Sequence, residues 1–140
     1  MNGRQVSWLF VPGDAPQRIA RALASPADVV VLDLADGVPL ASKTAARTEV
    51  ARVLESPEAA ARCFVRISVQ GSDDLERTRR QMADCGAARR AAGLVLPRCE
   101  GPADIVALSA RIARQQAVVA IVTGTARGVQ YLADFREPLP

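Results

Sequence analysis

Short apolar runs alternate with helical patterns along this chain, and the alternation constrains the fold more than any other feature. The second run reads VVVLDL, which is typical of a strand buried on both faces of a parallel sheet. Strands that alternate with helices predict a parallel α/β sheet with right-handed crossovers. The apolar runs are Ser7–Val11, Val29–Leu34, Cys63–Ile67, Gly93–Leu96 and Val118–Val122.

Helical patterns occupy the segments between these runs. Ser42 is the expected N-cap of the second helix, and Ile105, Leu108 and Ile112 recur at helical spacing in the fourth. The sequence leaves open whether the third helix, which is rich in arginine, continues past Gly86. The helices are expected at Pro16 to about Ala24, Ser42 to Leu54, from near Asp73, from Pro102, and from about Gly128 to Asp134.

The spacing of the strands indicates what this sheet belongs to. Strand centres recur roughly every 28 residues, so eight such units would need about 224 residues, close to the usual ~250 of a closed (β/α)₈ barrel. The chain has 140 residues and five strand patterns. We therefore expect a single domain over residues 1–140 that forms a partial TIM barrel of about five βα units.

The absence of histidine narrows the chemistry that the chain can perform. It excludes Ser-His-Asp and Cys-His nucleophiles, histidine metal ligands and an imidazole base. Arginine supplies all the basic residues except Lys43. Catalysis would have to rest on carboxylates, arginines, Lys43, backbone amides or a metal held by oxygen.

Composition also excludes several partners and locations. Cys63, Cys85 and Cys99 have no CxxC spacing, which favours buried thiols in a reducing cytosol and hence a cytoplasmic location. No apolar run approaches the ~20 residues that span a bilayer, so no membrane association is expected. The net charge is only +3, and the arginines lack interleaved aromatic residues, so we expect no nucleic-acid binding.

Polar residues that directly follow the strands are the candidate site, because ligands bind at the carboxyl ends of parallel strands. Arg66 is notable because it lies within the apolar run FVRI, where a charge is costly unless it is paired. Its planar fork suits a carboxylate or enolate oxygen. The sequence supports equally well a purely structural role for Arg66, in a salt bridge to Asp33 or Asp36.

Three carboxylates lie at or just after the strand ends, and the sequence allows two roles for each of them. Asp33 and Asp36 could orient an arginine or help to hold a hard cation, or Asp33 pairs internally while Asp36 caps the next turn. Glu100 could face the pocket, or it is a favourable charge at the helix start before Pro102.

Five segments resemble the HpcH/HpaI aldolase and citrate lyase family, in particular its citrate lyase β-subunit-like and malyl-CoA-lyase-like branch. The first two are long: SWLFVPGDAPQRIARAL and VVVLDLADGVPLASKTAAR. They occur in the order and spacing of the family and cover most of the chain. The segments are Ser7–Leu23, Val29–Arg47, Val65–Ile67, Gly93–Ile105 (GLVLPRCEGPADI) and Thr125–Val129 (TARGV).

This resemblance implies a (β/α)₈ barrel, usually assembled into trimers or hexamers. It implies cleavage or formation of a carbon–carbon bond in citryl- or malyl-type acyl thioesters. It also implies a Mg²⁺ ion that stabilises the developing enolate. The expected partners are an acyl-CoA or organic-acid substrate and either further copies of the chain or a partner chain that completes the barrel.

The resemblance implies functional roles for particular residues of this chain. It places Arg66 against the substrate carbonyl or enolate as the catalytic residue, and it places Asp36 in an acidic pair after the second strand. Pro97 and Arg98 occupy the place of a Pro-Lys pair after the fourth strand, so Asp36, Arg66, Pro97 and Arg98 are the expected substrate-binding residues.

The sequence departs from the family at its carboxylates. Ala35 replaces the first acid of the acidic pair, since LEDG reads LADG here. Gly124 stands before TARG, where the family has a metal-ligand Glu, and the second ligand Asp would follow a sixth strand. Glu100 and Asp36 remain as carboxylate candidates, so no metal ligand is assigned.

Two hypotheses therefore stay open. The chain is a Mg²⁺-dependent lyase, or it is a truncated or degenerate relative without catalysis that keeps a binding or assembly role. In either case the open edges of the first and fifth strands predict oligomerisation.

Overall fold

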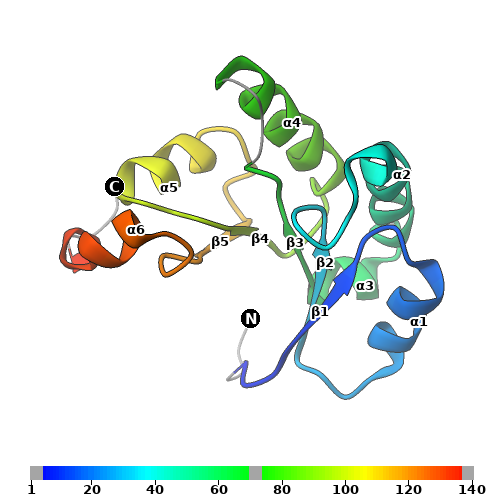
Figure 1. The fold of residues 1–140 in the computed structure, drawn as a ribbon. Coiled ribbons are helices and arrows are strands. Elements are labelled where there is room, and N and C mark those ends of the chain that lie inside the picture. Colours follow the sequence, from blue (N-terminus) through cyan, green and yellow to red (C-terminus); the bar gives the residue numbers. More distant parts are fainter. Residues whose placement is uncertain (1–4, 70–73, 137–140) are drawn as a thin grey trace.

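Five parallel strands form one sheet in the order β1-β2-β3-β4-β5. The structure is a computed structural model that describes residues 5–69 and 74–136. Helices follow the strands and form an outer layer around the sheet (Figure 1). This is the expected run of βα units of a partial TIM barrel. The strands are β1 (Trp8–Pro12), β2 (Val29–Asp33), β3 (Cys63–Arg66), β4 (Gly93–Leu96) and β5 (Ala117–Ala120).

The outer layer contains six α-helices and two short 3₁₀ helices within the described residues. The expected helix from Gly128 to Asp134 is divided between α6 and η2, and α4 continues past Gly86 by one residue. The start of α4 expected near Asp73 lies outside the described residues. The helices are α1 (Pro16–Ala24), η1 (Leu40–Ser42), α2 (Lys43–Val53), α3 (Pro57–Arg62), α4 (Asp74–Ala87), α5 (Pro102–Ser109), α6 (Ala126–Gln130) and η2 (Leu132–Arg136).

The short helix α3 is absent from the sequence-based prediction. Its N-cap Ser56 accepts a hydrogen bond from the backbone N–H of Ala59, and Pro57 occupies the first turn. These are ordinary helix-start signals. Six residues rich in alanine carry too little apolar periodicity to be recognised as a helix.

Of two expectations about helix ends, one is confirmed and one is wrong. Ser42 occupies the N-cap position of α2, but its side chain makes no capping hydrogen bond, since Ser42 is also the last residue of the 3₁₀ turn η1 that leads directly into α2. Ile112 lies beyond α5, which ends at Ser109. It still packs against the core, so its apolar character reflects burial in the following turn rather than helical spacing.

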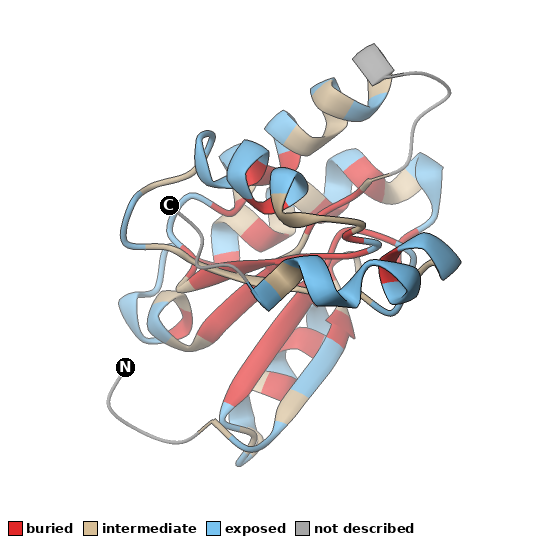
Figure 2. Ribbon diagram, turned by 90° about the vertical axis from the view of Figure 1, so that its left-hand side faces the viewer, coloured by how far each residue is buried: buried red, intermediate tan, exposed pale blue. Residues whose placement is uncertain are grey.

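Side chains alternate between the two faces of the sheet, as period-two strands require. Leu32, Val65 and Leu94 face the helices and join the main core. Val31, Phe64 and other side chains of the opposite face form a second cluster, which the ring of Trp8 extends at 4.9 Å from the ring of Phe64. The central strands β2, β3 and β4 are almost wholly buried, whereas β1 and β5 are more exposed, and Figure 2 shows this burial on the ribbon.

The three cysteines are free thiols and buried, as expected. Burial raises the pKa of the Cys63 thiol to about 11. None of the described helices combines the length and apolar character needed to cross a membrane.

Candidate functional site

Arg66 and Asp33 form a two-bond ion pair at the carboxyl ends of β2 and β3. The two residues are register partners on neighbouring strands, so their side chains emerge side by side. Nε of Arg66 donates to Oδ1 of Asp33 at 2.8 Å, and Nη2 donates to Oδ2 at 2.5 Å. The salt-bridge alternative for Arg66 is therefore realised, and the partner is Asp33 rather than Asp36.

The Asp33 carboxylate is saturated with hydrogen bonds. Besides the guanidinium, Oδ1 accepts from the backbone N–H of Ala35 at 2.7 Å, and Oδ2 accepts from that of Gly37 at 2.8 Å. A Cβ at Gly37 would lie only 2.3 Å from Oδ2, so this contact requires glycine. Asp33 therefore holds the Arg66 guanidinium in place, and each of its two carboxylate oxygens accepts from two nitrogen donors.

One guanidinium nitrogen of Arg66, Nη1, is not engaged by Asp33. Its guanidinium carbon lies 5.5 Å from the centroid of the half-exposed Phe10 ring, an additional favourable contact. Hydrogen bonding to Asp33 raises the pKa of Arg66 above its ordinary value, so the side chain stays charged. Among the described residues no acceptor bonds Nη1, which can donate to an incoming oxygen while Asp33 holds the group in place.

Lys43 is notable in the sequence only as the single lysine, but in the structure it contacts the loop that follows β2. Its side chain is buried, and Nζ donates to the carbonyl oxygens of Leu34, at 2.5 Å, and Ala35. Burial lowers the pKa of Lys43. The ammonium thus links α2 to the loop after β2, whose backbone N–H groups bond the Asp33 carboxylate.

A second buried group, Asp84 of α4, was missed by sequence reasoning. It accepts from Nε of Arg47 at 2.6 Å and from the backbone N–H of Ser68 at 2.7 Å. Ser68 in turn donates from Oγ to the Leu34 carbonyl at 2.7 Å. This network joins the loops after β2 and β3 to α2 and α4. An aspartate inside an arginine-rich helix gives no signal that distinguishes it from a solvated charge.

Asp36 and Arg98 come together from the loops after β2 and β4. Nη2 of Arg98 lies 3.9 Å from Oδ1 of Asp36, and both side chains are about half exposed. Arg98 has φ 52°, the left-handed region that a non-glycine residue rarely adopts. Pro97, next to it, is buried. The predicted substrate-binding residues Asp36, Arg66, Pro97 and Arg98 therefore all lie at one edge of the sheet.

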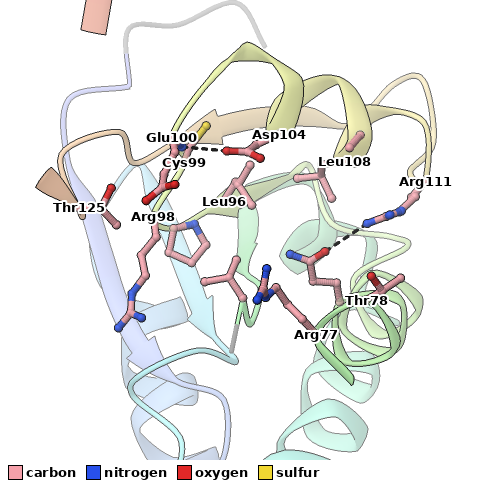
Figure 3. Close-up of a pocket in the computed structure, with 14 residues that line it drawn as sticks. Arg77, Thr78, Leu96, Arg98, Cys99, Glu100, Asp104, Leu108, Arg111 and Thr125 are labelled. Atoms are coloured by element: carbon pink, nitrogen blue, oxygen red, sulfur yellow. Dashed lines mark hydrogen bonds between the residues drawn. The ribbon is translucent and has the colours of Figure 1, made fainter. Parts of the chain in front are cut away.

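Glu100 lines a cavity of about 640 Å³ between α4 and α5. Its carboxylate lies 3.8 Å from Nε of Arg127, and its backbone N–H donates to Oδ2 of Asp104 at 2.8 Å. Arg98, Glu100 and Thr125 lie together at one end of the cavity (Figure 3). Glu100 thus faces the pocket, the first of the two alternatives for this residue.

The carboxylates of this edge do not form a Mg²⁺ site by themselves. Asp33, Asp36 and Glu100 each face a guanidinium. Across residues 5–69 and 74–136, no three side chains of the His, Cys, Asp or Glu type lie close enough together to hold a metal ion. A Cβ added at Gly124 would lie 3.4 Å from Arg98, an ordinary contact, so the position can accept a side chain that the chain lacks.

Comparison with known proteins gives consistent matches along the chain. The family model described as HpcH/HpaI aldolase/citrate lyase matches residues 6–129. A citrate lyase subunit beta-like protein of Mycobacterium tuberculosis is 40% identical over 128 residues, which are 91% of this chain and 42% of that protein. The chain therefore spans about two fifths of the length of this curated relative.

Solved structures agree with these matches. The citrate lyase beta subunit of M. tuberculosis, complexed with oxaloacetate and magnesium, aligns with a TM-score of 0.69 and 38% identity over 91% of this chain and 51% of that one. The protein CitE of M. tuberculosis, in complex with magnesium, acetoacetate and coenzyme A, aligns with a TM-score of 0.70 and 36% identity. This alignment covers 94% of this chain and 45% of that one.

Proposed function

The chain belongs to the HpcH/HpaI aldolase/citrate lyase family, and from this membership we propose that it carries part of a carbon–carbon lyase site for citryl- or malyl-type acyl thioesters. Because the chain spans 42% of the curated relative, the activity of the whole protein is itself part of the proposal. The two-bond Asp33–Arg66 pair at the strand edge is the observation that carries it.

The chemistry requires a cation where negative charge develops. Cleavage breaks the bond between the hydroxyl-bearing carbon and the carbon next to the thioester. The first becomes a carbonyl carbon as the hydroxyl gives its proton to water, and the electron pair passes into the thioester as an enolate, which then takes up a proton from water. Nη1 of Arg66 would donate to that enolate oxygen, and Asp33 prevents the guanidinium from reorienting.

Known relatives support the substrate class. The M. tuberculosis proteins were solved with oxaloacetate or with acetoacetate and coenzyme A, and both structures contain magnesium. For this chain we propose an organic acid or its CoA thioester as ligand. No step of the proposal passes through a metal, because the described carboxylates do not form its ligand set.

A second candidate is a relative without catalysis that retains only binding or assembly. Ala35 and Gly124 occupy two positions where the resemblance places carboxylates, and the remaining acids at the edge face arginines. This arrangement favours anion binding over metal binding.

We also propose that residues 1–140 form one domain that acts in the cytoplasm as an oligomer. The edges of the sheet at β1 and β5 each have one neighbouring strand. Pairing with another copy or with a partner chain that completes the barrel would satisfy them.

Cleavage of malyl-CoA and citryl-CoA in the presence of Mg²⁺ tests the lyase proposal. We expect turnover by the wild type and a fall in kcat/KM of about 10²-fold in Arg66→Lys, which keeps the charge but loses the fork. Arg52→Lys, on the exposed face of α2, is the matched control and should match the wild type. A folded wild type without turnover would instead support the second candidate.

A further inference from the structure

We propose that Asp84 of α4 is a positioning residue that fixes the orientation of Arg66 through the loops after β2 and β3. The proposal rests on the role given to Arg66 under the proposed function, and Asp84 itself touches no ligand in it. The Asp84 side chain is 0% exposed, compared with 6% for Asp33. Burial of a carboxylate is costly unless hydrogen bonds compensate, so the groups that bond Asp84 indicate what it serves.

The two carboxylate oxygens of Asp84 hold two different elements. Oδ2 accepts from the backbone N–H of Ser68 at 2.7 Å, on the loop after β3. Oδ1 accepts from Nε of Arg47 at 2.6 Å, on α2. Asp84 therefore ties α4 both to the loop after β3 and to α2.

Both of these connections lead to the carbonyl oxygen of Leu34. Oγ of Ser68 donates to this oxygen at 2.7 Å. Lys43 lies one helical turn before Arg47 on α2, and its Nζ donates to the same oxygen at 2.5 Å. Burial lowers the pKa of Lys43, and the Asp84 carboxylate acts in the opposite direction. Asp84 thus helps to keep the ammonium charged.

The loop that begins at Leu34 fixes the partner of Arg66. Leu34 follows Asp33 directly along the chain. The same loop presents the backbone N–H groups of Ala35 and Gly37 to the Asp33 carboxylate, which holds Nε and Nη2 of Arg66. A shift of the Leu34 carbonyl would move these donors and with them the guanidinium. Binding groups that are held by such supporting bonds lose their geometry when the support is removed.

Hydrogen exchange at the Nε–H of Arg66 reports its orientation directly, because a proton bonded to Asp33 is protected from water. Proton–nitrogen NMR of the full chain in slightly acidic solution follows this proton, and loss of the resonance in Arg66→Lys assigns it. In Asp84→Asn the NH₂ group faces one of the two donors, which loses its acceptor. We expect the exchange rate at Arg66 to rise about tenfold or more. If Asp84 only stabilised the fold, this local rate would stay as in the wild type.

Two further variants complete the test. Ser68→Ala removes the bond to Leu34 and adds no donor, and it should raise the exchange rate in the same direction. Asp28→Asn is the matched control, because Oδ2 of Asp28 also accepts from two backbone N–H groups, at 2.9 and 2.8 Å, but at the opposite end of β2. It should change the rate at Arg66 by less than about twofold.

An unchanged exchange rate in a folded Asp84→Asn would overturn the proposal, as would an equal rise in Asp28→Asn. If Asp84→Asn does not fold, the rate in Ser68→Ala decides in the same way. Oxaloacetate binding measured on the same samples separates this proposal from the proposed function. A wild type that binds no oxaloacetate would contradict the proposed function, whereas the exchange rates need no ligand.

Discussion

Replacement of Asp33 by asparagine should destabilise the fold, because the carboxylate accepts four hydrogen bonds. Each oxygen receives one bond from Arg66 and one from a backbone amide, of Ala35 or Gly37. In Asp33→Asn, an NH₂ group replaces one of the two carboxylate oxygens. This group is a donor, so the two donors that bonded that oxygen lose their acceptor and two hydrogen bonds are lost. Charged hydrogen bonds contribute about 1.5–3 kcal/mol each. Since Arg66 retains 20% exposure and water can solvate it, we expect a total loss of about 3 kcal/mol.

Urea unfolding followed by the fluorescence of Trp8, the single tryptophan, measures this change. Trp8 packs on Phe64 in the sheet, so its emission reports the same cooperative unit. Asp36→Asn, on the loop that follows β2 and half exposed, is the control and should change the free energy of unfolding by less than about 1 kcal/mol. A loss below about 0.5 kcal/mol in Asp33→Asn would show that the carboxylate does not hold Arg66 as described.

Lys43→Arg should lower the free energy of unfolding by about 1–3 kcal/mol in urea, because a longer planar group must replace a buried ammonium between two carbonyls. Gly124→Glu should fold normally and should bind Mg²⁺ more tightly than the wild type in calorimetry. The wild type should show no stoichiometric binding at micromolar Mg²⁺, and tight binding by the wild type would refute this prediction. The pKa of Cys63 is raised from 9.0 to about 11 in the folded state, so the unfolded chain loses this proton first and stability should fall as pH rises from 9 to 11. The slope of urea midpoints over that range should be shallower in Cys63→Ala. Light scattering should show a dimer or larger species, and a strict monomer at high concentration would count against pairing through β1 or β5.

The sheet could be predicted from the sequence because its signals are local. Five apolar runs place the strands within a few residues, and parallel strands bring their carboxyl ends to one edge. Arg66, Asp36 and Arg98 could be placed there for that reason. The two possible partners of Arg66 could not be separated, because the choice depends on the register of β2 against β3.

The supporting network was beyond sequence reasoning because its contacts are long-range. Arg47 and Asp84 are 37 residues apart, and Lys43 acts on backbone carbonyls that no side-chain pattern reveals. The left-handed backbone of Arg98 is likewise a consequence of tertiary context, since the residue type disfavours it.

If Asp33 orients Arg66 to bind a substrate oxygen, the affinity for oxaloacetate depends on Arg66, and this dependence can be measured without catalysis. Calorimetry should show binding to the wild type and an affinity at least about tenfold lower in Arg66→Gln. Arg52→Gln, which removes the same charge from an exposed pair, should bind as the wild type does. Equal affinity of the wild type and a folded Arg66→Gln would contradict the assignment of Arg66 as the anion-binding group.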